Sequence, residues 1–247
     1  MDSLESNRTV LVALCTFNER ENLPPLLVKI RETLPDCDVL VIDDNSPDGT
    51  PQWLESRGDA DALWLKFVIR RDQRGLGSAV RTAMELACRG GYQWLLHLDA
   101  DFSHDPAELP RLLARAEDPG DPCDCVVGSR YCEGGTIAGW TAGRRWMSRT
   151  VNRFATSVLR LPVTDCSGSL RCYRVQTLRE MGPSTLQSEG YAVFEEILLR
   201  LREIGARFGE LPITFHERRA GESKLGMHEA ARSAWNLLQL ARKTRTR

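Results

Sequence analysis

The feature that most constrains the fold is a regular alternation of short apolar runs with amphipathic segments. The runs at 9–17, 37–44, 63–69, 94–100 and 123–131 have the length and composition of buried strands, and helical spacing of apolar residues separates the first four. Strands joined by helices pair in parallel, and helices then cover both faces of the sheet. The sequence therefore predicts an α/β fold with a largely parallel central sheet.

Several of these strands end in charged or polar residues. In open parallel sheets, ligands bind beyond the carboxyl ends of the strands. One charged strand end is an ordinary loop start, but several that meet at one edge favour a binding site. The residues concerned are Asn18, Glu19, Asp43, Asp44, Asp99, Asp101 and Arg130.

The stretch LLHLDADFSHDP, residues 95–106, gives this edge its chemistry. Asp99 and Asp101 alternate, so an extended chain points both carboxylates to one face. Two like charges that close raise each other's pKa unless a cation compensates them. Hard carboxylate oxygens suit Mg²⁺ or Mn²⁺, which bind through one or two carboxylates plus substrate phosphates and water. We therefore predict a divalent metal site here.

Basic residues that could bind phosphate follow later in the chain. Arg130 ends a strand, Arg144 and Arg145 open a helix, and a glycine-containing loop carries Arg218 and Lys224. One guanidinium group can donate two parallel hydrogen bonds to a phosphate, whereas lysine acts as a point charge. GLGSAV, residues 75–80, lacks the third glycine of a dinucleotide-binding loop, so it is either a flexible loop near phosphates or a simple helix start.

Composition limits the function classes. The chain has 247 residues and a net charge of −1, which gives no indication of nucleic-acid binding. No apolar run approaches the roughly 20 residues of a membrane span, and the polar N-terminus does not resemble a signal peptide. The eight scattered cysteines are typical of reduced thiols. We expect one domain over 8–215, followed at 216–247 by a basic loop and an amphipathic helix.

An ordered set of motifs resembles a known family. CTFNERENL, VIDDNSPDGT, RGLGSAV, LDADFSHDP, VVGSRY, GWTAGRRWMSRTVN, GYAVFEE and ERRAGESKL occur in the order found in dolichol-phosphate (polyprenol-phosphate) mannosyltransferases, which are inverting family 2 glycosyltransferases. The resemblance spans roughly residues 8 to 228. It implies a GT-A fold and transfer of mannose from GDP-mannose to dolichyl or polyprenyl phosphate, giving a β-linked product with Mg²⁺ or Mn²⁺.

The resemblance also implies roles for individual residues. Asp99, Asp101 and Ser103 would hold the metal, with Ser103 in place of a family glutamine, and Asp101, Arg130 and Arg144 would be catalytic. Arg130, Arg144 and Ser148 would bind the acceptor phosphate. The nucleotide-binding set is Cys15, which replaces a frequent proline, with Phe17, Glu19, Ile42, Asp44, Asp99, Ala100, Arg218 and Lys224.

The implied reaction needs no strong general base, because the attacking oxygen of a lipid phosphate is already anionic. The sequence is consistent with this, since its histidines are dispersed and form no recognisable catalytic group. Two alternatives stay open: the same fold acting on UDP-glucose or another nucleotide sugar with a different lipid or glycan acceptor, and a non-catalytic nucleotide-sugar binder. A nucleotidyltransferase is disfavoured, because ALCTFNERENL has no glycine to grip a triphosphate.

A polyprenyl acceptor lies in a membrane, so we expect a cytoplasmic, peripherally membrane-associated protein. Either the basic C-terminal helix or the arginine stripe of Arg145, Arg149 and Arg153 could rest on anionic lipid. These arginines and the C-terminal helix could equally be an ordinary solvated surface and a helix docked on its own domain. A separate membrane-spanning subunit is a further route to the lipid.

Overall fold

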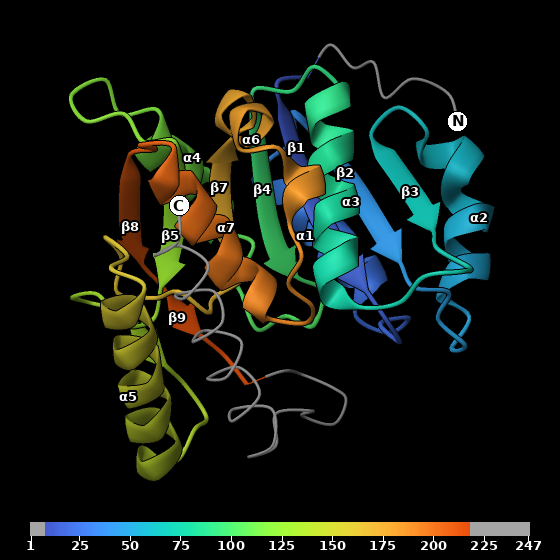
Figure 1. Ribbon diagram of the computed structural model, residues 1–247. Coiled ribbons are helices and arrows are strands. Elements are labelled where there is room, and N and C mark those ends of the chain that lie inside the picture. The colour runs from blue at the N-terminus through green and yellow to red at the C-terminus, as the bar shows by residue number, and fades with distance from the viewer. Residues whose placement is uncertain (1–7, 218–247) are drawn as a thin grey trace.

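The computed structural model describes residues 8–217, which form a seven-stranded sheet between two layers of helices (Figure 1). The strand order is β3-β2-β1-β4-β7-β5-β8. The strands are β1 (Val10–Thr16), β2 (Cys37–Asp43), β3 (Leu65–Ile69), β4 (Trp94–Asp99), β5 (Cys125–Ser129), β7 (Arg171–Arg174) and β8 (Phe208–Pro212). All adjacent pairs are parallel except those that β7 makes with β4 and β5. The predicted α/β fold with a largely parallel sheet is confirmed.

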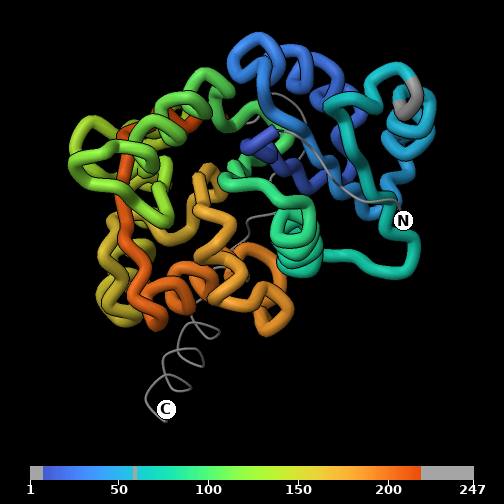
Figure 2. The backbone as a smooth tube through the Cα atoms, turned by 90° about the horizontal axis from the view of Figure 1, so that it is seen from above, coloured from blue at the N-terminus to red at the C-terminus, as the bar shows by residue number. Residues whose placement is uncertain are grey.

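Helices cover both faces of this sheet, as Figures 1 and 2 show. One apolar cluster joins a sheet face to α3 (Leu76–Arg89), α6 (Val175–Met181) and α7 (Ala192–Glu203). The other joins the opposite face to α1 (Leu23–Thr33), α2 (Thr50–Asp61) and α4 (Glu108–Ala116). Since both faces are covered, the central strands are apolar on both sides, which explains their uninterrupted apolar runs.

The strand register brings separate parts of the sequence together at one edge. Cys15, near the end of β1, lies between Ile42 of β2 and Asp99 of β4. All three strands run in the same direction, so their carboxyl ends open on the same side of the molecule. The predicted convergence of the β1, β2 and β4 ends is therefore confirmed.

The second half of the chain departs from simple alternation. β7 inserts antiparallel between β4 and β5, and a short 3-10 helix, η1 (Pro183–Thr185), follows α6. A separate two-stranded sheet pairs β6 (Thr136–Ile137) with β9 (Thr214–Phe215). β9 follows β8 (Phe208–Pro212) after a single residue, so the two strands of this segment belong to different sheets.

Helix α5 (Ala142–Val158) projects from the body on the side of the strand carboxyl ends (Figure 1). Thr141 caps its N-terminus by accepting a hydrogen bond from the backbone N–H of Arg144. Only Asn152, Ala155 and Thr156 of this helix are buried. The amphipathic helix predicted within 216–247 lies outside the described residues, so the division at 215/216 stays a prediction.

Candidate active site

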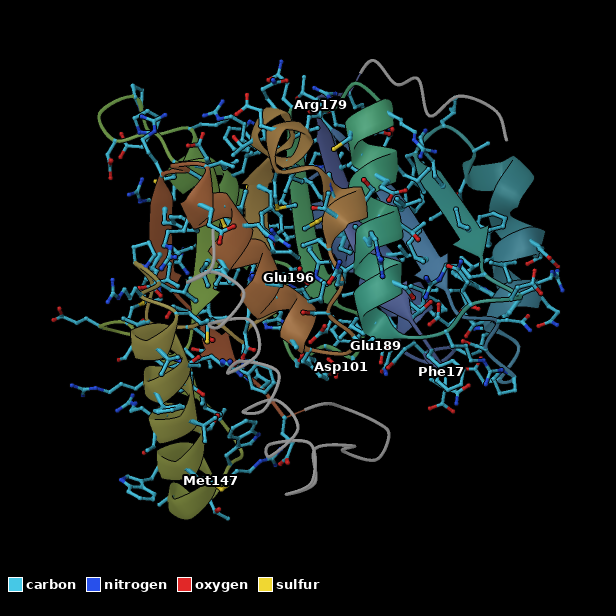
Figure 3. The ribbon with its side chains drawn as sticks, viewed as in Figure 1. Phe17, Asp101, Met147, Arg179, Glu189 and Glu196 are labelled. Carbon is cyan, nitrogen blue, oxygen red and sulfur yellow. The ribbon has the colours of Figure 1, made fainter. Side chains whose placement is uncertain are left out.

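The carboxyl edge of the sheet carries the two acidic residues predicted to hold a metal. Asp99 is the last residue of β4 and is half-buried, whereas Asp101 is only 6 % exposed. The Asp101 Oδ1 accepts a hydrogen bond of 3.0 Å from the backbone N–H of Ser103. Phe102, between Asp101 and Ser103, has a φ of 60°, so the chain turns sharply directly after the acidic pair. Figure 3 shows Asp101 on the same lower edge as Phe17 and Glu189.

The donor set fits a hard divalent ion that also binds substrate. Asp99 and Asp101 supply carboxylate oxygens, and no group of three or more His, Cys, Asp or Glu residues suited to a metal occurs among the described residues. Two carboxylates leave coordination positions for phosphate and water, as Mg²⁺ and Mn²⁺ sites commonly do. Ser103, the predicted third ligand, is buried, and its Oγ lies 3.5 Å from the Nδ1 of His104.

The predicted nucleotide-binding residues at the ends of β1 and β2 lie beside the acidic pair. The guanidinium of Arg74 stands 5.3 Å from the centre of the Phe17 ring. The carboxylate of Glu19 accepts a 2.7 Å hydrogen bond from the Asn22 amide. Burial raises the pKa of the Cys15 thiol well above its usual range, so Cys15 packs as a neutral apolar group. Figure 3 places Phe17 at the edge of the sheet.

Asp44 is held by two partners that approach from other elements. Arg70, directly after β3, donates from Nε at 2.7 Å and also from Nη2 to the Asp44 Oδ1. The backbone N–H of Gly75 donates to Oδ2 at 2.7 Å. Asp44 therefore ties the end of β2 to the end of β3 and the start of α3. The buried ion pair with Arg70 was not predicted from the sequence.

Arg130, at the end of β5, is buried and fixed in one orientation. Its Nε and Nη2 donate to the two carboxylate oxygens of Asp165 at 2.7 and 2.8 Å, and Nη2 also donates to Ser167 at 2.7 Å. Burial alone would lower the pKa of Arg130, but the Asp165 carboxylate overrides it and raises that pKa. The pKa of Asp165 is correspondingly lowered by Arg130 in spite of its burial. Both groups stay charged.

His104 and Arg130 lie against the same aromatic ring, Phe215. The centre of the His104 ring lies 5.3 Å from the centre of the Phe215 ring in an edge-on arrangement, and the guanidinium of Arg130 lies 5.4 Å from the same centre. Burial lowers the pKa of His104, so the imidazole is neutral at physiological pH, and its Nε2 is buried without a hydrogen bond among the described residues. A neutral histidine here adds no charge to the site.

The predicted acceptor-side residues on α5 are partly engaged. Arg144 donates to the Glu217 carboxylate at 3.0 Å and stacks 4.0 Å from the centre of the Trp140 ring. The Ser148 hydroxyl lies 2.6 Å from the Tyr131 hydroxyl. Arg218 and Lys224, predicted to bind phosphate, lie outside the described residues.

The loop at 187–191, before α7, reaches the same edge, and it is held by contacts that were not predicted from the sequence. The carboxylate of Glu196 accepts hydrogen bonds from the backbone N–H groups of Gln187 and Ser188 at 2.9 and 2.7 Å. A Cβ at Gly77, in the first turn of α3, would lie 2.3 Å from the Ser188 carbonyl oxygen. Only glycine allows this approach, and Figure 3 shows that the loop carries Glu189 to the edge near Asp101.

Sequence reasoning missed Arg70, Asp165, His104 and Phe215. The only signal for Arg70 is its place after a strand in a basic stretch, and the only signal for Asp165 is a single acid in a turn-rich segment. Their roles depend on pairings 26 and 35 residues distant in sequence.

Comparison with protein families matches residues 11–182 to glycosyl transferase family 2. The chain belongs to this family, as its motifs predicted. A protein of Micrococcus luteus named undecaprenyl-phosphate mannosyltransferase is 38 % identical over 216 residues, 87 % of each chain. The polyprenol monophosphomannose synthase of Mycolicibacterium smegmatis is 36 % identical over 223 residues, which are 90 % of this chain and 83 % of the relative.

Solved structures share the fold at lower identity. The mannosyltransferase PcManGT from Pyrobaculum calidifontis, in complex with GDP-Man and Mn²⁺, has a TM-score of 0.61 and 18 % identity. The match covers 98 % of this chain but only 65 % of that one. Glucosyl-3-phosphoglycerate synthase from Mycobacterium tuberculosis, in complex with Mn²⁺, UDP and phosphoglyceric acid, has a TM-score of 0.65 and 17 % identity over 95 % of this chain and 79 % of that one. These likenesses support the GT-A fold.

Proposed function

We propose that this protein transfers mannose from GDP-mannose to a polyprenyl phosphate, with inversion at the anomeric carbon and a β-linked lipid-phosphate mannose as product. The observation that carries the proposal is the meeting of opposite charges at one sheet edge. The carboxylates of Asp99 and Asp101 end β4, and the fixed guanidinium of Arg130 ends β5 close by. The names of the two relatives, which cover most of this chain, point to the same reaction.

The chemistry needs charge stabilisation more than proton transfer. An acceptor phosphate oxygen is already an anion, so the reaction does not need the buried, neutral His104 as a general base. A divalent ion on Asp99 and Asp101, Mg²⁺ or Mn²⁺, would stabilise the charge of the leaving nucleoside diphosphate. The Nη1 of Arg130 makes no hydrogen bond among the described residues, so it can donate to the acceptor phosphate while Asp165 holds the other two nitrogens.

The remaining assignments follow the positions of the side chains. We assign the nucleotide to the ends of β1 and β2, where Cys15, Phe17, Glu19, Ile42 and Asp44 gather. Asp44 would share its carboxylate between Arg70 and the ribose. Ala100, between the two metal-binding carboxylates, would contact the nucleotide through its backbone, and Ser103 would act on the metal through water. Arg218 and Lys224 stay predictions for the diphosphate.

The reaction is tested by incubating the protein with GDP-mannose, polyprenyl phosphate and Mn²⁺ or Mg²⁺ and measuring mannosyl lipid by mass spectrometry. We expect transfer from GDP-mannose and much less from UDP-glucose. Asp101→Asn should abolish transfer and also the rise in melting temperature that Mn²⁺ with GDP gives to the wild type. Asp36→Asn is the control, because Asp36 is exposed and directly precedes the start of β2, at the opposite end of that strand from Asp44. Transfer by the wild type without any divalent ion would refute the metal role.

We also propose that α5 places the protein on the membrane surface. Its exposed apolar side chains are Trp146, Met147, Val151 and Phe154, which are 72, 49, 40 and 52 % exposed. Arg145, Arg149 and Arg153 are exposed on the same helix. Among the described residues no helix is long and apolar enough to cross a membrane. Figure 3 shows Met147 near the far end of α5, on the same lower side as Asp101.

An apolar strip flanked by arginines suits an interfacial helix on anionic lipid. We expect the protein to co-sediment with phosphatidylglycerol vesicles at low salt and less with phosphatidylcholine vesicles. Phe154→Ser combined with Met147→Ser should reduce this binding, whereas Leu63→Ser, at a position 88 % exposed on the α2–β3 turn, should not. Vesicle binding that both α5 substitutions leave intact would assign membrane attachment to another part of the chain.

A further inference from the structure

The turn at 164–168, before β7, carries the carboxylate that holds Arg130. Asp165 is fully buried, and its two carboxylate oxygens accept hydrogen bonds from the Nε and Nη2 of Arg130 at 2.7 and 2.8 Å. Asp165 lies in neither a helix nor a strand, so the regular hydrogen bonds of secondary structure do not fix its position. Side chains from neighbouring elements must therefore determine where this carboxylate stands.

Asn152 of α5 binds the backbone on both sides of Asp165. Its Nδ2 donates to the carbonyl oxygen of Thr164, and its Oδ1 accepts a hydrogen bond of 3.0 Å from the backbone N–H of Cys166. Asn152 is 4 % exposed and is one of the three buried residues of α5. A side-chain amide offers a donor and an acceptor next to each other, so Asn152 pairs with the turn much as the backbone of an adjacent strand would.

Two further side chains hold the same turn from the central sheet. Arg171 of β7 donates to the carbonyl oxygen of Cys166 at 2.6 Å. Glu210 of β8 accepts a hydrogen bond of 3.2 Å from the backbone N–H of Asp165. Asn152 differs from both, because it stands on the helix that projects from the body (Figure 1). Its amide therefore links this helix to the turn that carries the Asp165 carboxylate.

We propose that Asn152 is a positioning residue, which fixes Asp165 and through it the guanidinium of Arg130. The inference rests on the proposed function, in which the Nη1 of Arg130 donates to the acceptor phosphate. Two parallel hydrogen bonds between a carboxylate and a guanidinium need a fixed geometry, so a displaced turn would turn Arg130 away from the acceptor. A displacement of about 1 Å at such a group can cost about a hundredfold in rate.

Kinetics with a short, soluble acceptor tests this role apart from membrane attachment. Farnesyl phosphate is used below its micelle concentration, with Mn²⁺. Asn152→Ala should lower kcat/KM for farnesyl phosphate about tenfold or more, because a lost buried hydrogen bond is on this scale, and should leave the KM for GDP-mannose unchanged. Thr156→Ala is the matched control, since Thr156 is also buried on α5 but its hydroxyl donates to the Arg153 carbonyl oxygen of the same helix. It should keep the wild-type kcat/KM.

A double-mutant cycle separates positioning from a general loss of stability. If Asn152 acts through the carboxylate of Asp165, Asn152→Ala should have little further effect in a protein that already carries Asp165→Asn. We expect kcat/KM of the double variant to lie within about threefold of that of Asp165→Asn alone. Losses that multiply would refute the proposal. Asn152→Asp, which keeps the size and the acceptor but loses the donor to Thr164, should give a smaller loss with the same dependence on Asp165, and it replaces Asn152→Ala if that variant does not fold.

A nuclear magnetic resonance measurement follows Arg130 without any reaction. The side-chain Nε–H of an arginine that is held by a carboxylate exchanges slowly with water, and Arg130→Lys identifies the signal by its loss. We expect Asn152→Ala, or Asn152→Asp in its place, to speed this exchange severalfold and Thr156→Ala to leave it unchanged. An exchange rate that the Asn152 variant does not alter would mean that the turn holds Asp165 without Asn152, and would refute the proposal.

The positioning role and the proposed function fail in different ways. If the wild type transfers mannose and the Asn152 variant keeps its kcat/KM for farnesyl phosphate, the positioning role is wrong and the proposed function stands. If the Asn152 variant speeds the exchange of the Arg130 Nε–H but the wild type transfers mannose to no polyprenyl phosphate, the proposed function is wrong, whereas the control of Arg130 by Asn152 stands.

Discussion

Glu195 provides a test of the physical reasoning that does not depend on the reaction. Its side chain lies in the first turn of α7 and is 6 % exposed, and its Oε2 is buried without a hydrogen bond among the described residues. Burial raises the pKa of this carboxyl from 4.5 to about 8, although the charge of Arg171 opposes the rise. Arg171 donates instead to the carbonyl oxygens of Gly168, Phe194 and Cys166 at 2.8, 2.7 and 2.6 Å.

The sign of the pH effect follows from these two pKa values. In the unfolded chain the carboxyl ionises near pH 4.5, whereas in the folded protein it keeps its proton until about pH 8. Between these values ionisation stabilises only the unfolded state, so the free energy of unfolding falls as pH rises, by about 1.4 kcal/mol per pH unit. At pH 7, two and a half units above the unfolded value, the loss from Glu195 is about 3 kcal/mol. At pH 5 it is less than about 1 kcal/mol.

The substitution Glu195→Gln removes this titration and keeps the size of the side chain. Any packing cost of the amide is the same at both pH values, so the informative quantity is the change in the variant's relative stability between pH 5 and pH 7. The variant should gain about 2.5 kcal/mol relative to the wild type over this interval, or roughly 5–10 °C in melting temperature for a domain of this size. Calorimetry at the two pH values measures it, with the exposed Glu180→Gln as control.

An infrared measurement checks the protonation state directly. At pH 6 the wild type should show a protonated-carboxyl stretching band that Glu195→Gln lacks. A pH-independent stability difference together with no such band would mean that Glu195 is ionised in the fold and paired with Arg171. That result would refute the argument that burial outweighs the nearby cation.

Two further predictions concern contacts that hold the site. Asp165→Asn should leave the buried Arg130 without a compensating charge, which destabilises the protein by about 3 kcal/mol in chemical denaturation and lowers kcat for mannose transfer more than it changes the KM for GDP-mannose; a fully stable, fully active variant would contradict the pairing. Gly77→Ala should force the Ser188 carbonyl away from α3 and cost about 1–3 kcal/mol. Gly143→Ala, where a Cβ meets nothing within 4 Å, should be neutral or slightly stabilising, and equal effects of both substitutions would show that close approach is not the cause.

The sequence predicts the part of the fold in which neighbours in the chain are also neighbours in space. The strands β1 to β4 alternate with helices, so periodicity identifies each element, and the rule for parallel sheets places Asp44 and Asp99 at one edge. The position of β7 does not follow from this rule, because β7 runs antiparallel between β4 and β5. Its partners lie about 45 to 80 residues away in sequence. Short strands of mixed character carry no local signal of such a partner.

The pairing of Arg130 with Asp165 could not be predicted for the same reason. Asp165 follows α5 in the chain, and nothing in its local sequence identifies a cation 35 residues earlier. Once β7 has inserted beside β5, the turn that precedes β7 must pass the end of β5, and this brings the carboxylate to the guanidinium. The roles of these two residues are therefore products of topology rather than of local pattern.

The two acidic pairs of the sequence look equivalent, and the structure distinguishes them. Asp43 accepts hydrogen bonds from the hydroxyls of Thr16 and Ser46 at 3.0 and 2.6 Å, and Asp44 is held by Arg70 and Gly75. A metal at this pair would have to displace those donors and leave Arg70 buried without its carboxylate, which is a large cost.

Asp99, the last residue of β4, differs from Asp43 and Asp44 in its partners. For the Asp99 carboxylate, the described residues provide no side-chain hydrogen bond and no ion pair, whereas the Oδ1 of Asp101 accepts a hydrogen bond from the backbone N–H of Ser103. Asp99 is only half-buried, so its carboxylate remains accessible to a cation. The same residue type at the ends of neighbouring strands thus stabilises the fold on β2 and suits a divalent ion on β4, and the difference lies in which partners the rest of the chain provides.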